Sequence, residues 1–444
     1  MKNKYLLMLF GLALASCSDM PTPVDDQKQE ISKEEPKNED EVERPFDPTK
    51  LKPYQPIYLS EIEKSLNMQQ TDFSVNFFKT AQKERTEQNF VVSPYSVATA
   101  LSMLTNGADG NTAAELQNVL LGEGTSLSDL NEYNKRIATA IDTIDGFTTL
   151  DIANGIFPDK NVTLSGQFID NNKNFYNASV LPVNFNNLAE CNLILNKWVD
   201  DATHGLIKKM SVSNYTPLLI ANTIYFKSSW EKAFDKDNTQ DAPFYNFDKT
   251  VSTVKMMESG SYDYTFDGEF AILSRDFGNR AFSMHIAYNY DDKENSLNGI
   301  ENILTKENIK KYLSSRRDGT GTIKLPRFEV AISDINIDAL LQEVGIKELF
   351  GQTPDLSKVF ADKEKSLFKP SVFHECVLKV DETGTEAAAK TNIIYVSCDL
   401  DDNMVRPEPK SFVVDHPFIF WIAEQSTGTI LFMGQINKLE NAKE

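Results

Sequence analysis

The side chains best suited to nucleophilic or metal chemistry stand far apart in the 444-residue chain. It has no Gly-x-Ser-x-Gly nucleophile elbow, and none of these histidines and cysteines forms a pair with metal-ligand spacing: His204, His285, His374, His416, Cys191, Cys376 and Cys398. The three cysteines other than Cys17 also give no even disulfide framework. The sequence therefore predicts no catalytic residue, no metal site and no cofactor, and it predicts that the protein is not an enzyme.

The charge of the chain limits its partners. It contains 65 acidic and 45 basic residues, for a net charge of -20. Phosphates would repel such a surface, so nucleic acid is excluded as a partner. With 41% hydrophobic residues, the chain can bury a large core, and its length alone leaves one or two domains open.

One segment near the C-terminus, residues 380–398, alternates like a half-buried strand. From position 385 one set is small or apolar and the other mostly polar: Thr385, Ala387, Ala389, Thr391 and Ile393 against Glu386, Ala388, Lys390 and Asn392. A hinge-like Glu382-Thr383-Gly384 precedes it, and an acidic, proline-bearing run follows at 399–409. Because Glu-Ala-Ala-Ala-Lys also favours a helix, these residues alone leave helix, loop and strand open.

The order of residues in this segment resembles the hinge of the serpin reactive-centre loop, in which an acidic residue, a variable one, Gly, Thr, Glu and several alanines follow one another. The matching hinge residues are Glu382, Gly384, Thr385, Glu386, Ala387, Ala388 and Ala389. Residues 89–104 resemble the serpin strand-turn-helix that carries two serines, and further serpin-like segments follow at 196–207, 218–230, 324–328 and 412–434. The matches extend over roughly residues 60–440.

This resemblance implies an α+β (mixed) serpin fold with three β-sheets, about eight to nine helices and an exposed reactive-centre loop at about 382–411. It also implies a polar cluster, called the shutter in serpins, beneath the strands that part: Ser93, Ser96, Asn222 and His374. The residues themselves predict a central strand at 218–230 and another at 373–380. A buried Asn222 needs a hydrogen-bond partner, and we expect His374 to provide it.

The resemblance implies a suicide-substrate inhibitor of serine or cysteine endopeptidases. A protease would cut the loop and become acylated, and the cut loop would enter the main sheet while the covalent complex persists. The usual loop length places the cut after Cys398 and before Asp399, with the bonds after Val396, Ser397 or Asp399 as alternatives because the loop is long. We expect the inhibitor to be a monomer.

The N-terminus reads as an export signal. Lys2 and Lys4 precede a short apolar run, and Leu14-Ala15-Ser16-Cys17 resembles a bacterial lipobox. We therefore expect a lipoprotein signal peptide at 1–17 ending at a lipidated Cys17, an acidic disordered tether at 18–58 and a serpin domain at 59–444. This predicts an exported lipoprotein held at the outer membrane and cell surface. The alternative is a plain secretory signal with an incidental cysteine.

Two other functions compete with inhibition. One is a serpin fold that acts as a carrier or binding module without inhibiting, and the other is a glycan-binding surface lipoprotein. Small residues at Thr385, Ala387 and Ala389 favour the inhibitor, because a bulky or charged inward side chain would obstruct insertion between strands.

Overall fold

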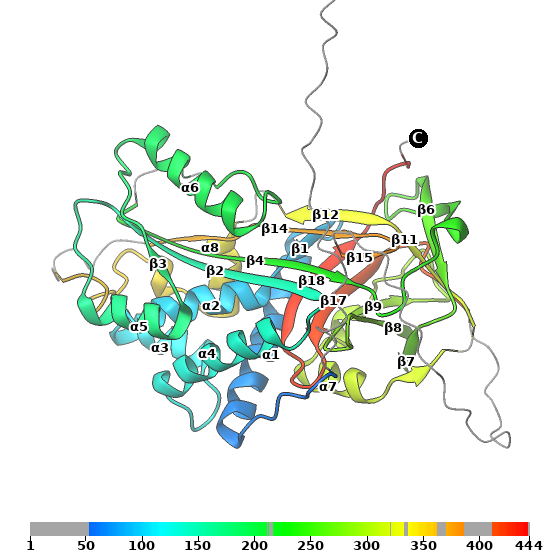
Figure 1. Cartoon of the computed structure of the whole chain (residues 1–444), viewed down its shortest axis with the longest axis horizontal. Helices are drawn as coiled ribbons and strands as arrows, with labels where there is room; N and C mark the ends of the chain where they lie inside the picture. Colours follow the sequence, from blue (N-terminus) through cyan, green and yellow to red (C-terminus); the bar gives the residue numbers. More distant parts are fainter. Residues whose placement is uncertain are drawn as a thin grey trace, which may run out of the picture. The chain divides into compact units, whose positions relative to one another are not determined.

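The computed structural model describes residues 53–210, 212, 216–319, 321–332, 336–361, 370–385 and 411–442. Over these residues the chain forms three β-sheets and eight α-helices (Figure 1), which confirms the predicted mixed fold. The helices are α1 (Glu61–Glu84), α2 (Pro94–Thr105), α3 (Gly110–Leu120), α4 (Leu127–Thr143), α5 (Gly166–Tyr176), α6 (Leu188–Ala202), α7 (Lys306–Ser314) and α8 (Ile337–Val344). None of the helices in this part of the chain is long and apolar enough to cross a membrane.

The main sheet contains the strand predicted at 218–230. Of the strand predicted at 373–380, residues 376–380 form one strand and Phe373 ends another, with His374 and Glu375 outside both. The strands of the main sheet are, in spatial order, β12 (Phe328–Ile332), β14 (Cys376–Val380), β15 (Gly384–Thr385), β4 (Leu218–Ser229), β2 (Thr148–Pro158) and β3 (Ser179–Val180), and β13 (Ser371–Phe373) also pairs with β4. The longest ladder joins β4 to β2, antiparallel, from Leu218↔Pro158 to Ser228↔Thr148. This ladder lies next to β15 in the sheet.

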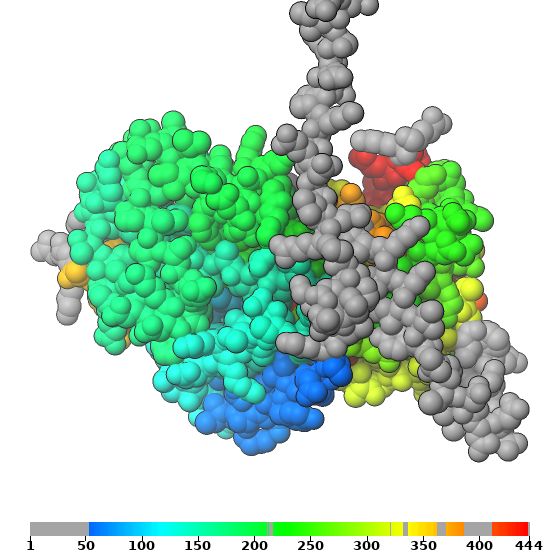
Figure 2. Space-filling view, viewed as in Figure 1, coloured from blue at the N-terminus to red at the C-terminus, as the bar shows by residue number. Residues whose placement is uncertain are grey.

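Alternate residues of β4 pack on opposite faces of the main sheet, as strand geometry requires. Leu218 and Ile220 join the large core shared with α1 and α2, whereas Leu219 and Ala221 join a smaller core with α6. Figure 1 shows α6 on one side of β2 and β4 and α2 on the other, and Figure 2 shows the atoms of α6 at the molecular surface. Both faces of the strand are therefore buried over residues 218–226, which explains its largely apolar sequence.

Two further sheets complete the fold. One has the order β1 (Phe90–Val92), β18 (Ile430–Ile436), β17 (Phe418–Glu424), β9 (Phe282–Asn289), β8 (Phe270–Phe277), β7 (Asp263–Asp267) and β10 (Arg317–Asp318). The other has the order β16 (Phe412–Val413), β11 (Ile323–Pro326), β6 (Val251–Ser259) and β5 (Gln240–Tyr245). The serpin-like segment at 412–434 thus supplies strands to both sheets.

The first helix begins where the sequence changes from polar to periodic. Ser60 caps α1 and forms a capping box with Glu63, an arrangement that satisfies free backbone N–H groups at the helix start. Residues 53–58, at the end of the range predicted to be a tether, contact the fold: the Tyr54 hydroxyl donates to Glu424, and the Ile57 N–H donates to Ser426.

Candidate functional site

Among the described residues, the main sheet is open along one side of β4. On that side β4 pairs with β13 at Leu219–Ala221, parallel, and with β15 at Ser228–Ser229, antiparallel. Between them, over residues 222–227, it pairs with no strand that the structure describes. Because β15 is also antiparallel to β14, β4 and β14 run parallel on either side of this opening.

The hinge residues Gly384 and Thr385 lie at one end of the opening as β15. Thr385 pairs with Val380 on one side and Ser228 on the other, and its hydroxyl accepts a hydrogen bond from the Ser228 N–H at 3.1 Å. Its side chain is buried, so the first residue of the predicted small, inward-facing set does lie inside the fold. The segment that sequence analysis left open is thus a strand at its first two residues.

Glycine is required at position 384 by the close approach of β4. Gly384 has a φ of +152°, and a Cβ added there would lie 1.9 Å from the Ser228 carbonyl oxygen. Any side chain would have to displace the backbone. Gly384 therefore allows β15 to lie this close to β4.

The residues just before β15 are held by hydrogen bonds to backbone and side chains. The Asp381 backbone carbonyl accepts from the Trp230 indole N–H at 2.9 Å, and the Glu382 and Thr383 carbonyls accept from the Phe234 and Trp230 amides at 2.8 and 2.9 Å. The start of the hinge is therefore fixed on the segment that follows β4.

The Glu382 carboxylate is the charged part of this attachment. It is 1% exposed and accepts from Arg327 Nε and Thr239 Oγ1, each at 2.6 Å. Burial alone would raise the pKa of Glu382, but the hydrogen bonds from Arg327 and Thr239 outweigh it and hold the pKa below its ordinary value. Sequence analysis identified Glu382 but missed Arg327 and Thr239, which lie 55 and 143 residues away along the chain.

Beneath the sheet, the four residues predicted to form a polar cluster lie close together. The Ser93 N–H donates to His374 Nε2 at 3.2 Å, and the Ser93 hydroxyl donates to the Leu431 carbonyl at 2.7 Å. The Ser96 hydroxyl donates to the Asn222 carbonyl at 3.0 Å. The bonds link the start of α2 to β4 and to the residue that follows β13.

The expected hydrogen bond between Asn222 and His374 is not present. Instead, Asn222 Nδ2 donates to Asn154 Oδ1 at 2.5 Å, and Asn154 Nδ2 donates to the Tyr176 carbonyl at 2.6 Å. The reason is geometric: Asn154 lies directly opposite Asn222 in the β2–β4 ladder. Sequence analysis missed Asn154, although a second asparagine within an apolar strand was a signal that could have found it.

The cluster is uncharged at neutral pH. Burial lowers the pKa of His374 to about 4, since a protonated imidazole would be desolvated there. Asn222 Oδ1 and His374 Nδ1 are both buried and have no hydrogen-bond partner among the described residues. The cluster thus retains unused hydrogen-bonding capacity at the edge of the opening.

This arrangement does not suit nucleophilic catalysis. His374 accepts from a backbone N–H, while the Ser93 hydroxyl donates to a carbonyl, so no histidine here activates a serine. Within the described residues, no group of three or more His, Cys, Asp or Glu side chains could hold a metal ion. The geometry suits a sheet that accepts another strand.

Several predicted site residues lie outside the described residues. They are the remaining hinge positions Glu386, Ala387, Ala388 and Ala389, the predicted cut at Cys398–Asp399 with the alternatives Val396 and Ser397, and the lipidation residue Cys17.

Comparison with known proteins matches this fold to one family over most of its length. Residues 68–439 match the family model described as Serpin (serine protease inhibitor). The chain is 31% identical to the leukocyte elastase inhibitor of Bos taurus over 386 residues, which are 84% of this chain and 99% of that protein.

Solved structures give the same fold. The native stressed conformation of Arabidopsis AtSerpin1 matches with a TM-score of 0.74 and 25% identity, covering 86% of this chain and 99% of that one. A thyroxine-binding globulin complex with thyroxine matches with a TM-score of 0.74 and 22% identity, covering 84% and 99%. The second likeness concerns the fold alone.

Proposed function

Because the chain belongs to the serpin family, we propose that it is a suicide-substrate inhibitor of serine or cysteine endopeptidases. The family is one of protease inhibitors rather than enzymes. The observation that carries the proposal is the position of β15 between β14 and β4, next to a stretch of β4 without a described partner on that side. The residues that follow Thr385 could therefore extend β15 along this stretch of β4.

Insertion provides the driving force. After a protease cuts the loop and is acylated on its own serine or cysteine, residues beyond Thr385 enter between β4 and β14 as a new strand. Each inserted residue gains ladder bonds, and a dozen bonds at about 1 kcal/mol each would supply roughly 10 kcal/mol. That is enough to distort a captured active site.

The alternation of the loop suits this path. Thr385 is buried, and period-two geometry gives Ala387 and Ala389 the same inward direction on insertion, with Ala388 and Lys390 outward. Small inward residues avoid overpacking and buried charge. Lys390 would lie on the face opposite Ala387 and Ala389, so it adds no charge to the inward face.

The bond offered to the protease is the one between Cys398 and Asp399, with the bonds after Val396, Ser397 or Asp399 as alternatives. The preceding Ile393-Ile394-Tyr395-Val396 suits proteases with extended apolar subsites. Similarity to a leukocyte elastase inhibitor supports an elastase-like target.

A pair of matched variants tests the mechanism. Ala387→Arg places a charge on the inward face and Ala388→Arg places the same charge on the outward face. After incubation with elastase-like, subtilisin-like and papain-like proteases, Ala388→Arg should form the denaturant-resistant complex and Ala387→Arg should be cut without trapping. Sequencing the released C-terminal fragment identifies the cut bond. Equal trapping by both variants would refute insertion.

The chain is further proposed to be an exported bacterial lipoprotein, a monomer anchored through Cys17. The support is the lipobox-like Leu14-Ala15-Ser16-Cys17 and the acidic segment after it. Two or three acyl chains would hold it firmly to a membrane, at the outer membrane and cell surface. Radiolabelled palmitate should enter the full chain in a Gram-negative host and be absent from Cys17→Ser; labelling of neither would refute the anchor.

A serpin-fold binding protein is the second candidate, because the fold also matches thyroxine-binding globulin. The two functions differ in what loop cleavage does. Insertion adds ladder bonds and raises the melting temperature, whereas a binding protein that does not insert keeps its melting temperature. A thermal scan before and after limited proteolysis distinguishes them.

A further inference from the structure

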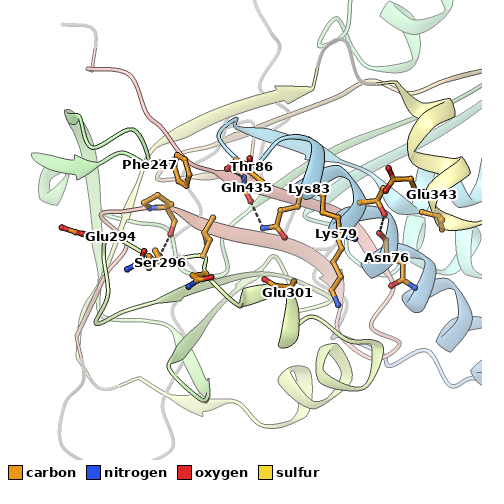
Figure 3. A pocket seen from close by; sticks show the side chains of 17 residues that line it. Asn76, Lys79, Lys83, Thr86, Phe247, Glu294, Ser296, Glu301, Glu343 and Gln435 are labelled. Carbon is orange, nitrogen blue, oxygen red and sulfur yellow. Dashed lines mark hydrogen bonds between the residues drawn. The ribbon is translucent and has the colours of Figure 1, made fainter.

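A second site lies on another part of the fold, in a cavity of about 840 Å³ between α1, the segment 294–301 and the end of α8 (Figure 3). This volume falls in the range of pockets that hold small molecules. Its lining includes side chains from six separate segments of the chain: Lys79 and Lys83 of α1, Phe247, Glu294 with Leu297 and Glu301, Glu343 with Val344, Pro417, and Gln435. None of these residues belongs to the hinge or to the cluster under the main sheet.

Hydrogen bonds within the protein connect the segments that line the cavity. Gln82 Nε2 donates to Gln435 Oε1 at 2.7 Å, which joins α1 to β18. The buried Ser296 hydroxyl donates to the Pro417 carbonyl at 2.6 Å, which fixes the segment 294–301 against the start of β17. The cavity is therefore preformed.

Lys79 and Lys83 bring two positive charges to the lining. Lys79 and Lys83 are one helical turn apart on α1, so like charges face the same side, and neither forms an ion pair with any carboxylate that the structure describes. Burial, more than the neighbouring Lys83, lowers the pKa of Lys79, although Glu301 and Asp72 attract its charge.

The acidic side chains of the lining have a different environment. Glu294, Glu301, Glu343 and Lys83 are all exposed, whereas Lys79 is partly buried. Solvent screens the three carboxylates more strongly than the Lys79 ammonium. The least hydrated charge that lines the cavity is therefore a cation.

The cavity also offers apolar surface. Phe247 is 42% exposed, a high value for a phenylalanine, and Leu297, Val344 and Pro417 share the lining. Figure 3 shows Phe247 at one end of the cavity and Lys79 toward the other. An aromatic or aliphatic body would remove Phe247 from water while an acidic group reached the lysines.

We propose that this cavity binds a small amphipathic anion, with a carboxylate or sulfonate on Lys79 and Lys83 and an apolar body against Phe247 and Leu297. The site is independent of the reactive loop. Loss of the ligand would leave covalent trapping of a protease unchanged.

The probe is 1-anilinonaphthalene-8-sulfonate, followed by fluorescence on the intact protein, with uncharged N-phenyl-1-naphthylamine as its partner. Lys79→Gln should weaken binding of the sulfonate about tenfold, the value of one charged hydrogen bond, and the double variant Lys79→Gln/Lys83→Gln should weaken it further. Binding of the uncharged probe should change less than twofold.

The matched control is Lys310→Gln. Lys310 lines a separate cavity of about 480 Å³ with Lys64, and burial lowers its pKa as it does that of Lys79. Lys310→Gln should leave sulfonate binding unchanged. Leu297→Trp, which fills the proposed site, should abolish sulfonate binding at an unaltered melting temperature. Equal loss in Lys310→Gln, no loss in the Lys79 variants, or no binding to the wild type would each overturn the proposal.

Discussion

The two ends of the opening between β4 and β14 are held by opposite kinds of chemistry. At the hinge end, an ionised Glu382 meets Arg327, whose side chain is 42% exposed. At the other end, the groups around His374 and Asn222 are neutral and buried. At the charged end, Arg327 can replace its contact with Glu382 by contact with water, whereas the buried groups at the neutral end have no such access to water. Acid should therefore weaken the two ends in separate pH ranges.

The largest expected effect is the acid sensitivity of the cluster around His374. Its folded pKa of about 4 lies below the ordinary 6.5, so the unfolded chain binds the proton first as the pH falls. Stability is therefore complete above about pH 6.5 and decreases as the pH falls to about 4, by roughly 3 kcal/mol. Urea unfolding of wild type and His374→Gln over this range measures the difference.

His285 has a strongly lowered pKa too, from burial and from Arg316, so wild type alone does not isolate one histidine. The difference between the pH profiles of wild type and His374→Gln isolates the contribution of His374. If His374→Gln retains the full wild-type slope between pH 6.5 and 4, the buried cluster is not the source.

At the hinge end, Glu382→Ala should cost about 2 kcal/mol, less than a fully buried pair, because Arg327 can turn toward water. The pKa of Glu382 is lowered, so its contribution is present above the ordinary value of 4.5 and disappears as the pH falls below it. Urea unfolding of wild type and Glu382→Ala at pH 7 and pH 3.5 measures the difference in stability between them. This difference should be smaller at pH 3.5.

Glu258→Ala is the matched control, since Glu258 pairs with Lys324 at 3.0 Å with both side chains well exposed. It should change stability by less than about 0.5 kcal/mol. Similar losses in both variants would show that the hinge attachment is an ordinary surface pair.

The sequence predicted the fold class, the paired strands and the residues gathered at both ends, because these follow from local pattern and from the serpin resemblance. It did not predict the partners Arg327, Thr239 and Asn154. Each meets its partner through strand register or through chain segments far apart in sequence, which local pattern does not encode. The prediction of a direct hydrogen bond between Asn222 and His374 was wrong for the same reason.

A smaller effect is expected from Gly384→Ala. Its Cβ would meet the Ser228 carbonyl, and the hinge can relieve the clash by leaving the sheet, so the cost is limited to the few bonds of β15, about 1–2 kcal/mol. Hydrogen exchange at the Ser228 amide, which donates to Thr385, should become faster. Gly268→Ala is the control, because its positive φ has open space around it. Unchanged exchange at Ser228 in Gly384→Ala would contradict the close approach.

The smallest effect separates the charged from the neutral donor at Glu382. Thr239→Val keeps the shape of the side chain and removes one neutral hydrogen bond, so it should cost about 1 kcal/mol. Because Arg327 remains, the cost should not change between low and high salt, whereas that of Glu382→Ala should shrink as salt screens the ion pair. Thr250→Val, which removes an exposed hydroxyl bonded to Asp248, controls for loss of a threonine hydroxyl from a carboxylate. A salt-dependent cost for Thr239→Val would mean that the hydroxyl acts by positioning the Arg327 pair, and the hinge would then be held by a single coupled unit.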